Sequence, residues 1–95
     1  MSKTIYKYAV SLSDEVVIEM PKGAEILHVE IGRLSIRGVP AQIWIWAIVD
    51  RGAPIENRHF SIRGTGHDLG STAAHYIATL MDGPFVCHLF ESEVR

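Results

Sequence analysis

Several features that would place a chain in a specialised class are missing from this sequence of 95 residues. Its single cysteine, Cys87, excludes an intrachain disulfide. No apolar run approaches the length of a membrane helix, so no membrane partner is expected. The formal net charge of −2 provides no overall basic field, which argues against DNA or RNA as a partner. Because residues 1–4 lead directly into strand-like sequence without a signal segment, we expect a cytoplasmic protein.

The sequence that is present predicts one β-rich domain over residues 1–95. Its hydrophobic fraction of 47% is enough for a packed core, and its length leaves no room for a second one. Apolar and polar residues alternate with period two, which is typical of half-buried strands. Strands are predicted at residues 5–10, 16–20, 26–31, 42–49, 58–63, 76–81 and 85–90. Six to seven short strands at this spacing indicate an all-β fold, either a small antiparallel sandwich or a barrel-like domain, with or without one short helix.

Two of these strands have distinctive patterns. In the third, Leu27 and Val29 are predicted to face one way, and His28 and Glu30 the other. The fourth, over 42–49, is apolar on both faces, as expected of a central strand or of a strand at an oligomer interface.

Three connecting segments have characteristic turn chemistry. Gly38-Val39-Pro40 predicts a hairpin before the fourth strand. An Asp-Gly sequence at 82–83 favours a hairpin between the last two strands. Between these segments, Ser71 or Thr72 would suit a helix cap, so helix and loop both remain open for residues 69–75.

A glycine-spaced turn, Gly64-Thr65-Gly66-His67, follows the fifth strand. Two glycines allow positive φ and expose backbone N–H groups, while neighbouring side chains offer hydrogen bonds to a phosphate or carboxylate. The alternative is a hairpin turn with polar decoration. The predicted ligand-binding residues are Arg58, Ser61, Arg63, Gly64, Thr65, Gly66 and His67, with Tyr6 or Tyr8 stacking on a base.

Trp44 and Trp46 share one face of the fourth strand and are predicted to lie in the core or in an oligomer interface. We favour an oligomer, since a two-sided apolar strand in a small domain needs cover on both faces.

The five histidines lack the spacing of a metal-binding motif, so no metal or other cofactor is expected. Cys87 and His88 point to opposite faces of one strand and therefore cannot act as a nucleophile and its base. His67 and Asp68 are the candidates for acid–base chemistry, for example in a phosphodiesterase, but we expect no enzyme because no second positioned group is evident.

Several segments together resemble a family of short proteins of unknown function carried by bacteriophages and prophages. The matching residues are 4–8, 20–27, 46–50, 58–67 and 85–91, including the Ile-Tyr-Lys-Tyr start, the Gly-Thr-Gly-His turn and the Phe-Val-Cys-His-Leu-Phe-Glu end. The resemblance implies a β-rich fold and a phage origin, and it supplies no catalytic residues.

Phage proteins of this size often act on host defence, and one class consists of oligomers that sequester nucleotide signals. The resemblance and the glycine turn together suggest such a sponge in the host bacterial cytoplasm, with a cyclic oligonucleotide or a cyclic ADP-ribose derivative as its ligand. The alternative is a structural or protein-docking module, and a small cyclic-nucleotide phosphodiesterase is a third hypothesis.

Overall fold

The computed structural model describes residues 2–11, 13–32, 42–69, 75–82 and 84–92. Seven strands lie in these ranges, and the fold is all-β: β1 (Lys3–Ser11), β2 (Glu15–Pro21), β3 (Glu25–Ile31), β4 (Gln42–Asp50), β5 (Ile55–Gly64), β6 (His75–Asp82) and β7 (Phe85–Ser92). This described part of the chain holds no helix with the length and apolar character needed to span a membrane. The predicted hairpin at Gly38-Val39-Pro40 and the predicted cap at Ser71 or Thr72 fall outside the described residues.

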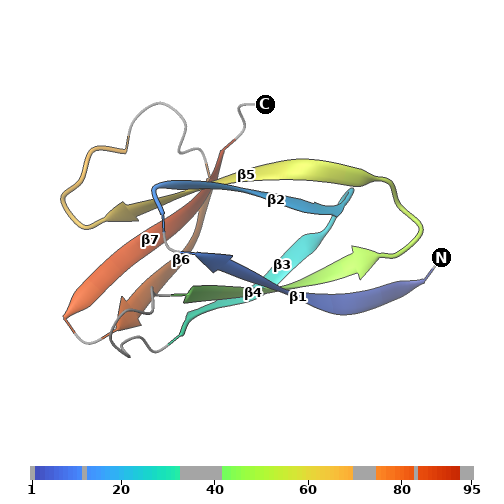
Figure 1. Cartoon of the computed structure of the whole chain (residues 1–95), viewed down its shortest axis with the longest axis horizontal. Helices are drawn as coiled ribbons and strands as arrows, with labels where there is room; N and C mark the ends of the chain where they lie inside the picture. The colour runs from blue at the N-terminus through green and yellow to red at the C-terminus, as the bar shows by residue number, and fades with distance from the viewer. Residues whose placement is uncertain (1, 12, 33–41, 70–74, 83, 93–95) are drawn as a thin grey trace.

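The strands form two antiparallel sheets that face each other, which confirms the predicted sandwich. Sheet A has the order β1-β4-β3, and sheet B has the order β2-β5-β7-β6. In Figure 1, β2 and β5 run above β1 and β4, and β6 and β7 cross toward the lower left. The chain passes between the sheets after β1, after β2 and after β4. The latter two crossings are tied together where the N–H of Lys22 donates to the carbonyl of Pro54.

The core lies between the sheets because side chains alternate between the two faces of each strand. Every second residue of β4, from Ile43 to Val49, is buried against the inner face of sheet B. Phe60, Met20 and Leu89 are the largest buried side chains on the opposing sheet. Cys87 is also buried there, and removal from water raises the pKa of its thiol.

The predicted alternation fails at Leu27, where β3 contains a β-bulge. Ile26 pairs with Ala47 and His28 with Trp46, so Leu27 is an extra residue without a partner on β4. Leu27 therefore lies with His28 on the outer side of the strand and is 46% exposed, whereas Val29 is buried. The prediction that Leu27 and Val29 share a face was wrong because one inserted residue reverses the facing of everything that precedes it.

Candidate functional site

Strand β5 divides the predicted ligand-binding residues between its two faces. Arg58 has the same parity as the buried residues Phe60 and Ile62 and therefore points toward the interior. Ser61 and Arg63 point to the outer face of sheet B, next to the glycine turn. The structure thus brings together Arg63 and the turn, and places Arg58 elsewhere.

Arg58 is held by a bidentate ion pair with Glu91 of β7. Its Nε and Nη2 donate to the two carboxylate oxygens at 2.5 and 3.0 Å, and its Nη1 donates to the carbonyl of Ala24 at 2.7 Å. The hydrogen bond to Glu91 raises the pKa of the guanidinium, against the opposing effect of burial. With these partners, Arg58 links β5, β7 and the turn that precedes β3, so its donors stabilise the fold and are not free for a phosphate.

Tyr6 and Tyr8 lie on the inner side of sheet A, across the sandwich from the glycine turn. Their rings meet edge to face, with centroids 6.3 Å apart. Burial raises the pKa of the Tyr8 hydroxyl, and the positive charge of Arg58 acts in the opposite direction. Tyr8 is therefore close enough to Arg58 to feel its charge, and neither tyrosine faces the turn.

Of the two glycines of the turn, only Gly66 takes the positive φ that the sequence allows for both. The N–H of His67 donates to the carbonyl of Gly64 at 3.0 Å, and Gly66 has a φ of 89°, as position three of a type II turn requires. The His67 ring folds back over Gly64, whose N–H donates to Nδ1 at 3.3 Å. A Cβ on Gly64 would lie 2.9 Å from this ring, so the glycine makes room for the histidine.

Gly66→Ala should lower the free energy of unfolding by about 1 to 2 kcal/mol, since an L-residue resists positive φ. No atom lies within 4 Å of the position of the added Cβ, so backbone strain would be the sole cost. Urea denaturation measures the effect, with Gly52→Ala as the matched control. Gly52 lies in an exposed turn without positive φ. Equal stabilities of the two variants would contradict the turn geometry.

Arg63 lies beside the turn, and some of its N–H donors already bond to acceptors of neighbouring residues. Its Nη1 donates to the carbonyls of Asp14 and Ile62 at 2.8 and 3.2 Å, and its Nη2 lies 3.5 Å from a Glu15 oxygen. Among the described residues, these contacts leave Nε–H and one Nη2–H without an acceptor. Ser61, although it faces outward, is 1% exposed and is not open to a ligand.

A chain of hydrogen bonds crosses the outer face of sheet B and ends at the turn. Tyr76 Oη lies 2.8 Å from Thr79 Oγ1, which lies 3.0 Å from His88 Nδ1. His88 Nε2 lies 2.9 Å from Thr65 Oγ1. We call Tyr76, Thr79, His88 and Thr65 the hydroxyl chain; it joins β6, β7 and the glycine turn.

An exposed aromatic ring begins this chain. The Tyr76 residue is 60% exposed, and its ring meets Phe90 edge to face with centroids 5.9 Å apart. Tyr76 pairs with Phe90, which is two residues from His88, or about 7 Å along the strand. The exposed tyrosine on the face of the turn is therefore Tyr76, where the sequence had suggested Tyr6 or Tyr8.

Sequence reasoning missed Thr79 and His88, although one signal could have found them. The predicted hairpin pairs Asp82 with Phe85, and counting outward from this pair places Thr79 opposite His88. Adding the glycine turn requires the β5–β7 pairing, in which Arg63 lies opposite His88. That pairing joins residues 25 positions apart (88 minus 63) and is not contained in any local pattern.

The histidines form no metal centre in the part of the chain that the structure describes. No group of three His, Cys, Asp or Glu side chains is arranged there to hold an ion. On the outer face of sheet B, the two ring nitrogens of His88 face hydroxyl oxygens.

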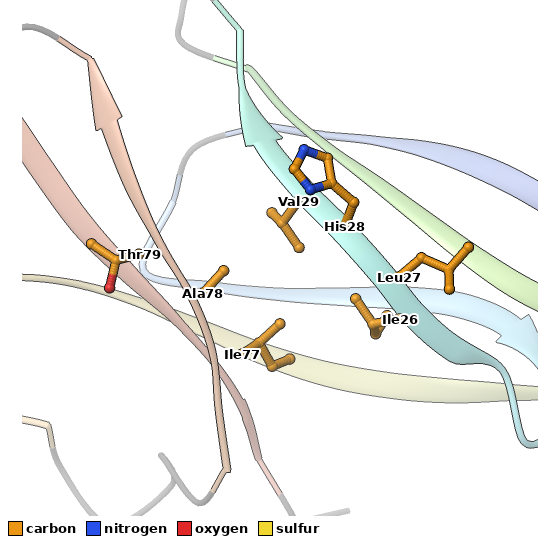
Figure 2. A pocket seen from close by; sticks show the side chains of 7 residues that line it. All are labelled: Ile26, Leu27, His28, Val29, Ile77, Ala78 and Thr79. Carbon is orange, nitrogen blue, oxygen red and sulfur yellow. The ribbon is translucent and has the colours of Figure 1, made fainter.

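A separate cleft of about 300 Å³ lies between the edge strands β3 and β6. Figure 2 shows Ile26 and Val29 on one strand and Ile77 and Ala78 on the other, directed into the space between them. β6 also has a register shift between Tyr76 and Ala78, so a bulge lies on each side of the cleft.

These features define a small β-sandwich with a hydrogen-bonded polar surface on one outer face. The chain belongs to the family described as a domain of unknown function, DUF7352, whose model matches residues 1–95. No curated protein matches the chain, and no solved structure does.

Proposed function

We propose that the protein is a non-enzymatic binding module that sequesters a nucleotide-type anion on the outer face of sheet B. The observation that carries the proposal is the hydroxyl chain, which connects an exposed aromatic ring to a glycine turn. A nucleotide base would stack on Tyr76, and its phosphate would lie at the turn beside Thr65, Gly66 and His67. Ring stacking and backbone N–H groups at a turn are general means of holding a base and a phosphate.

The direction of the hydrogen bonds in this chain suits an anion. If Tyr76 donates to Thr79 and Thr79 donates to His88 Nδ1, then His88 Nε2 carries the proton and donates to Thr65. The Thr65 hydroxyl proton is then available to the ligand. Aligned hydrogen bonds polarise one another, which strengthens the last donor.

His67 also presents a donor. Because the Gly64 N–H donates to Nδ1, the proton of the neutral ring lies on Nε2. A ring that offers N–H serves as a phosphate ligand and is poorly placed as a general base at that atom. This supports binding over the phosphodiesterase hypothesis.

The role that fits such a module is a sponge for a nucleotide immune signal. If the protein comes from a phage, as the sequence resemblance implies, it would withhold a cyclic oligonucleotide or a cyclic ADP-ribose derivative from its receptor. Sequestration needs a rigid surface and no chemistry, and a sheet face is such a surface.

Titration calorimetry with cyclic dinucleotides, cyclic trinucleotides and cyclic ADP-ribose isomers tests the proposal. Tyr76→Leu should weaken binding of the panel member that binds by about 5- to 150-fold, the equivalent of one stacking contact of about 1 to 3 kcal/mol. Thr65→Val, which keeps the side-chain shape, should weaken it by about tenfold through loss of one hydrogen bond to a charged group.

Tyr6→Leu is the matched control because it removes a 40% exposed tyrosine from the other sheet. Its affinity should equal that of the unmodified protein. The proposal fails if no panel member binds, or if Tyr6→Leu weakens binding and Tyr76→Leu does not. Release of a linear product during the titration would instead indicate the phosphodiesterase.

A further inference from the structure

The outer face of sheet A carries an apolar strip that the core does not use. Trp44, Trp46 and Ile48 point outward along the central strand β4, since the residues between them are buried. Ile5 on β1 is 56% exposed, and the bulge of β3 turns Leu27 to the same side. We call these five residues the Trp face. At one end of this face, Ile5 and Ile48 line a hollow of about 380 Å³ together with Lys3 and Thr4.

Charges of opposite sign flank the Trp face on its two sides. The outward residues of β1 include Lys3 and Lys7, and those of β3 include Glu25 and Glu30. Lys7 Nζ lies 4.2 Å from the centroid of the Trp44 ring, and His28 packs on Trp46 with ring centroids 5.6 Å apart. The one charged residue on the outer side of β4 itself is Asp50, whose carboxylate accepts a hydrogen bond from Gly52.

This arrangement is complementary to itself. A two-fold axis parallel to β4, between two facing copies, lays β1 of each copy over β3 of the other. The tryptophans then meet in the centre, and the basic edge of each copy faces the acidic edge of its partner. Pairing registers place Lys7 level with Trp46 and Glu30 level with Trp44, about 7 Å apart along the strands, which a lysine side chain spans.

We propose that the protein is a homodimer formed by the Trp faces of two copies, with Lys7 of each copy against Glu30 of the other. Such an interface has the same surface on both subunits, an apolar centre with aromatic residues, and charges at the rim. It leaves the outer face of sheet B open in both copies, so it does not depend on the proposed ligand. Two anion-binding faces would then point away from each other.

Charge reversal tests whether the partner is a second copy of this protein, because only a homodimer predicts rescue when two reversed variants are mixed. Lys7→Glu should weaken the dimer at least about tenfold, because two attractive pairs become repulsive, and Glu30→Lys should do the same. Mixing these two variants should restore a dimer, since each mixed contact again joins a glutamate to a lysine. Sedimentation velocity over a concentration series measures the constants, and native mass spectrometry identifies the mixed species.

Lys22→Glu and Glu19→Lys are the matched controls. Both residues are exposed, Lys22 in the turn after β2 and Glu19 on sheet B, and their variants should dimerise like the unmodified protein. A monomer at every concentration would overturn the proposal and would leave the Trp face to a different protein. A dimer that is insensitive to both reversals, or a mixture without the mixed species, would also overturn it.

Discussion

Replacing Arg58 with alanine is expected to lower the free energy of unfolding by about 2 to 4 kcal/mol, between the values for exposed and buried ion pairs. The side chains of Arg58 and Glu91 are 15% and 22% exposed, so little water would replace the lost contacts. The variant leaves the Glu91 carboxylate and the Ala24 carbonyl without the guanidinium that donates hydrogen bonds to them. Urea denaturation at neutral pH measures the change.

The protonation of Arg58 gives this stabilisation a simple pH dependence. The pKa of the guanidinium is raised in the folded protein, chiefly by its hydrogen bond to Glu91. A raised pKa stabilises the folded state at every pH below the ordinary pKa of the group, and the contribution is lost only in strong alkali. The effect of Arg58→Ala that comes from this charge should therefore stay present across the neutral range.

Arg63→Ala is the informative control because Arg63 also lies on β5 and belongs to the predicted site. It donates mainly to backbone carbonyls near an exposed segment, so its loss should cost about 1 kcal/mol. If Arg58→Ala were as stable as Arg63→Ala, Arg58 would be free to hold a ligand, and the structural assignment would be wrong.

Phe60→Ala should have the largest effect of any single change in the core, about 3 to 5 kcal/mol. Phe60 is 1% exposed and is the first in size among the fully buried side chains. It lies on β5, the strand between β2 and β7, so the cavity would open in the middle of sheet B. Thermal and urea denaturation followed by circular dichroism measure the loss.

Val17→Ala is a fair comparison because Val17 lies on the neighbouring strand β2 and is 56% exposed. Its loss should cost less than about 1 kcal/mol, the range of β-propensity differences. Similar losses in the two variants would mean that Phe60 is not buried in the core.

The strands were predictable because one-sided burial imposes period two on the sequence, and the turn residues mark where it stops. The apolar residues on both faces of β4 indicated either a central strand or an oligomer interface, and β4 does lie in the centre of sheet A. The bulges at Leu27 and Ile77 were not predictable. The extra residue in each is an ordinary apolar strand residue, so nothing in its type marks it as unpaired.

The glycine turn was also predictable, because Gly66 occupies a backbone conformation that few other residues adopt. The partners of the turn were not. Arg58 was assigned to the ligand because its pairing with Glu91 joins residues 33 positions apart and leaves no local trace. Tyr76 was not chosen as the stacking residue for the same reason, since its place on the face of the turn depends on how β5, β7 and β6 are ordered.

The most direct test of the proposed binding surface is an NMR titration of the ¹⁵N-labelled protein with the same cyclic nucleotides. We expect the amide shifts to concentrate at Thr65, Gly66 and His67 and to continue to Thr79 and His88 on the outer face of sheet B. Shifts confined to the Trp face, to the cleft between β3 and β6, or to the Arg58–Tyr8 region would contradict it, as would a spectrum that no cyclic nucleotide changes.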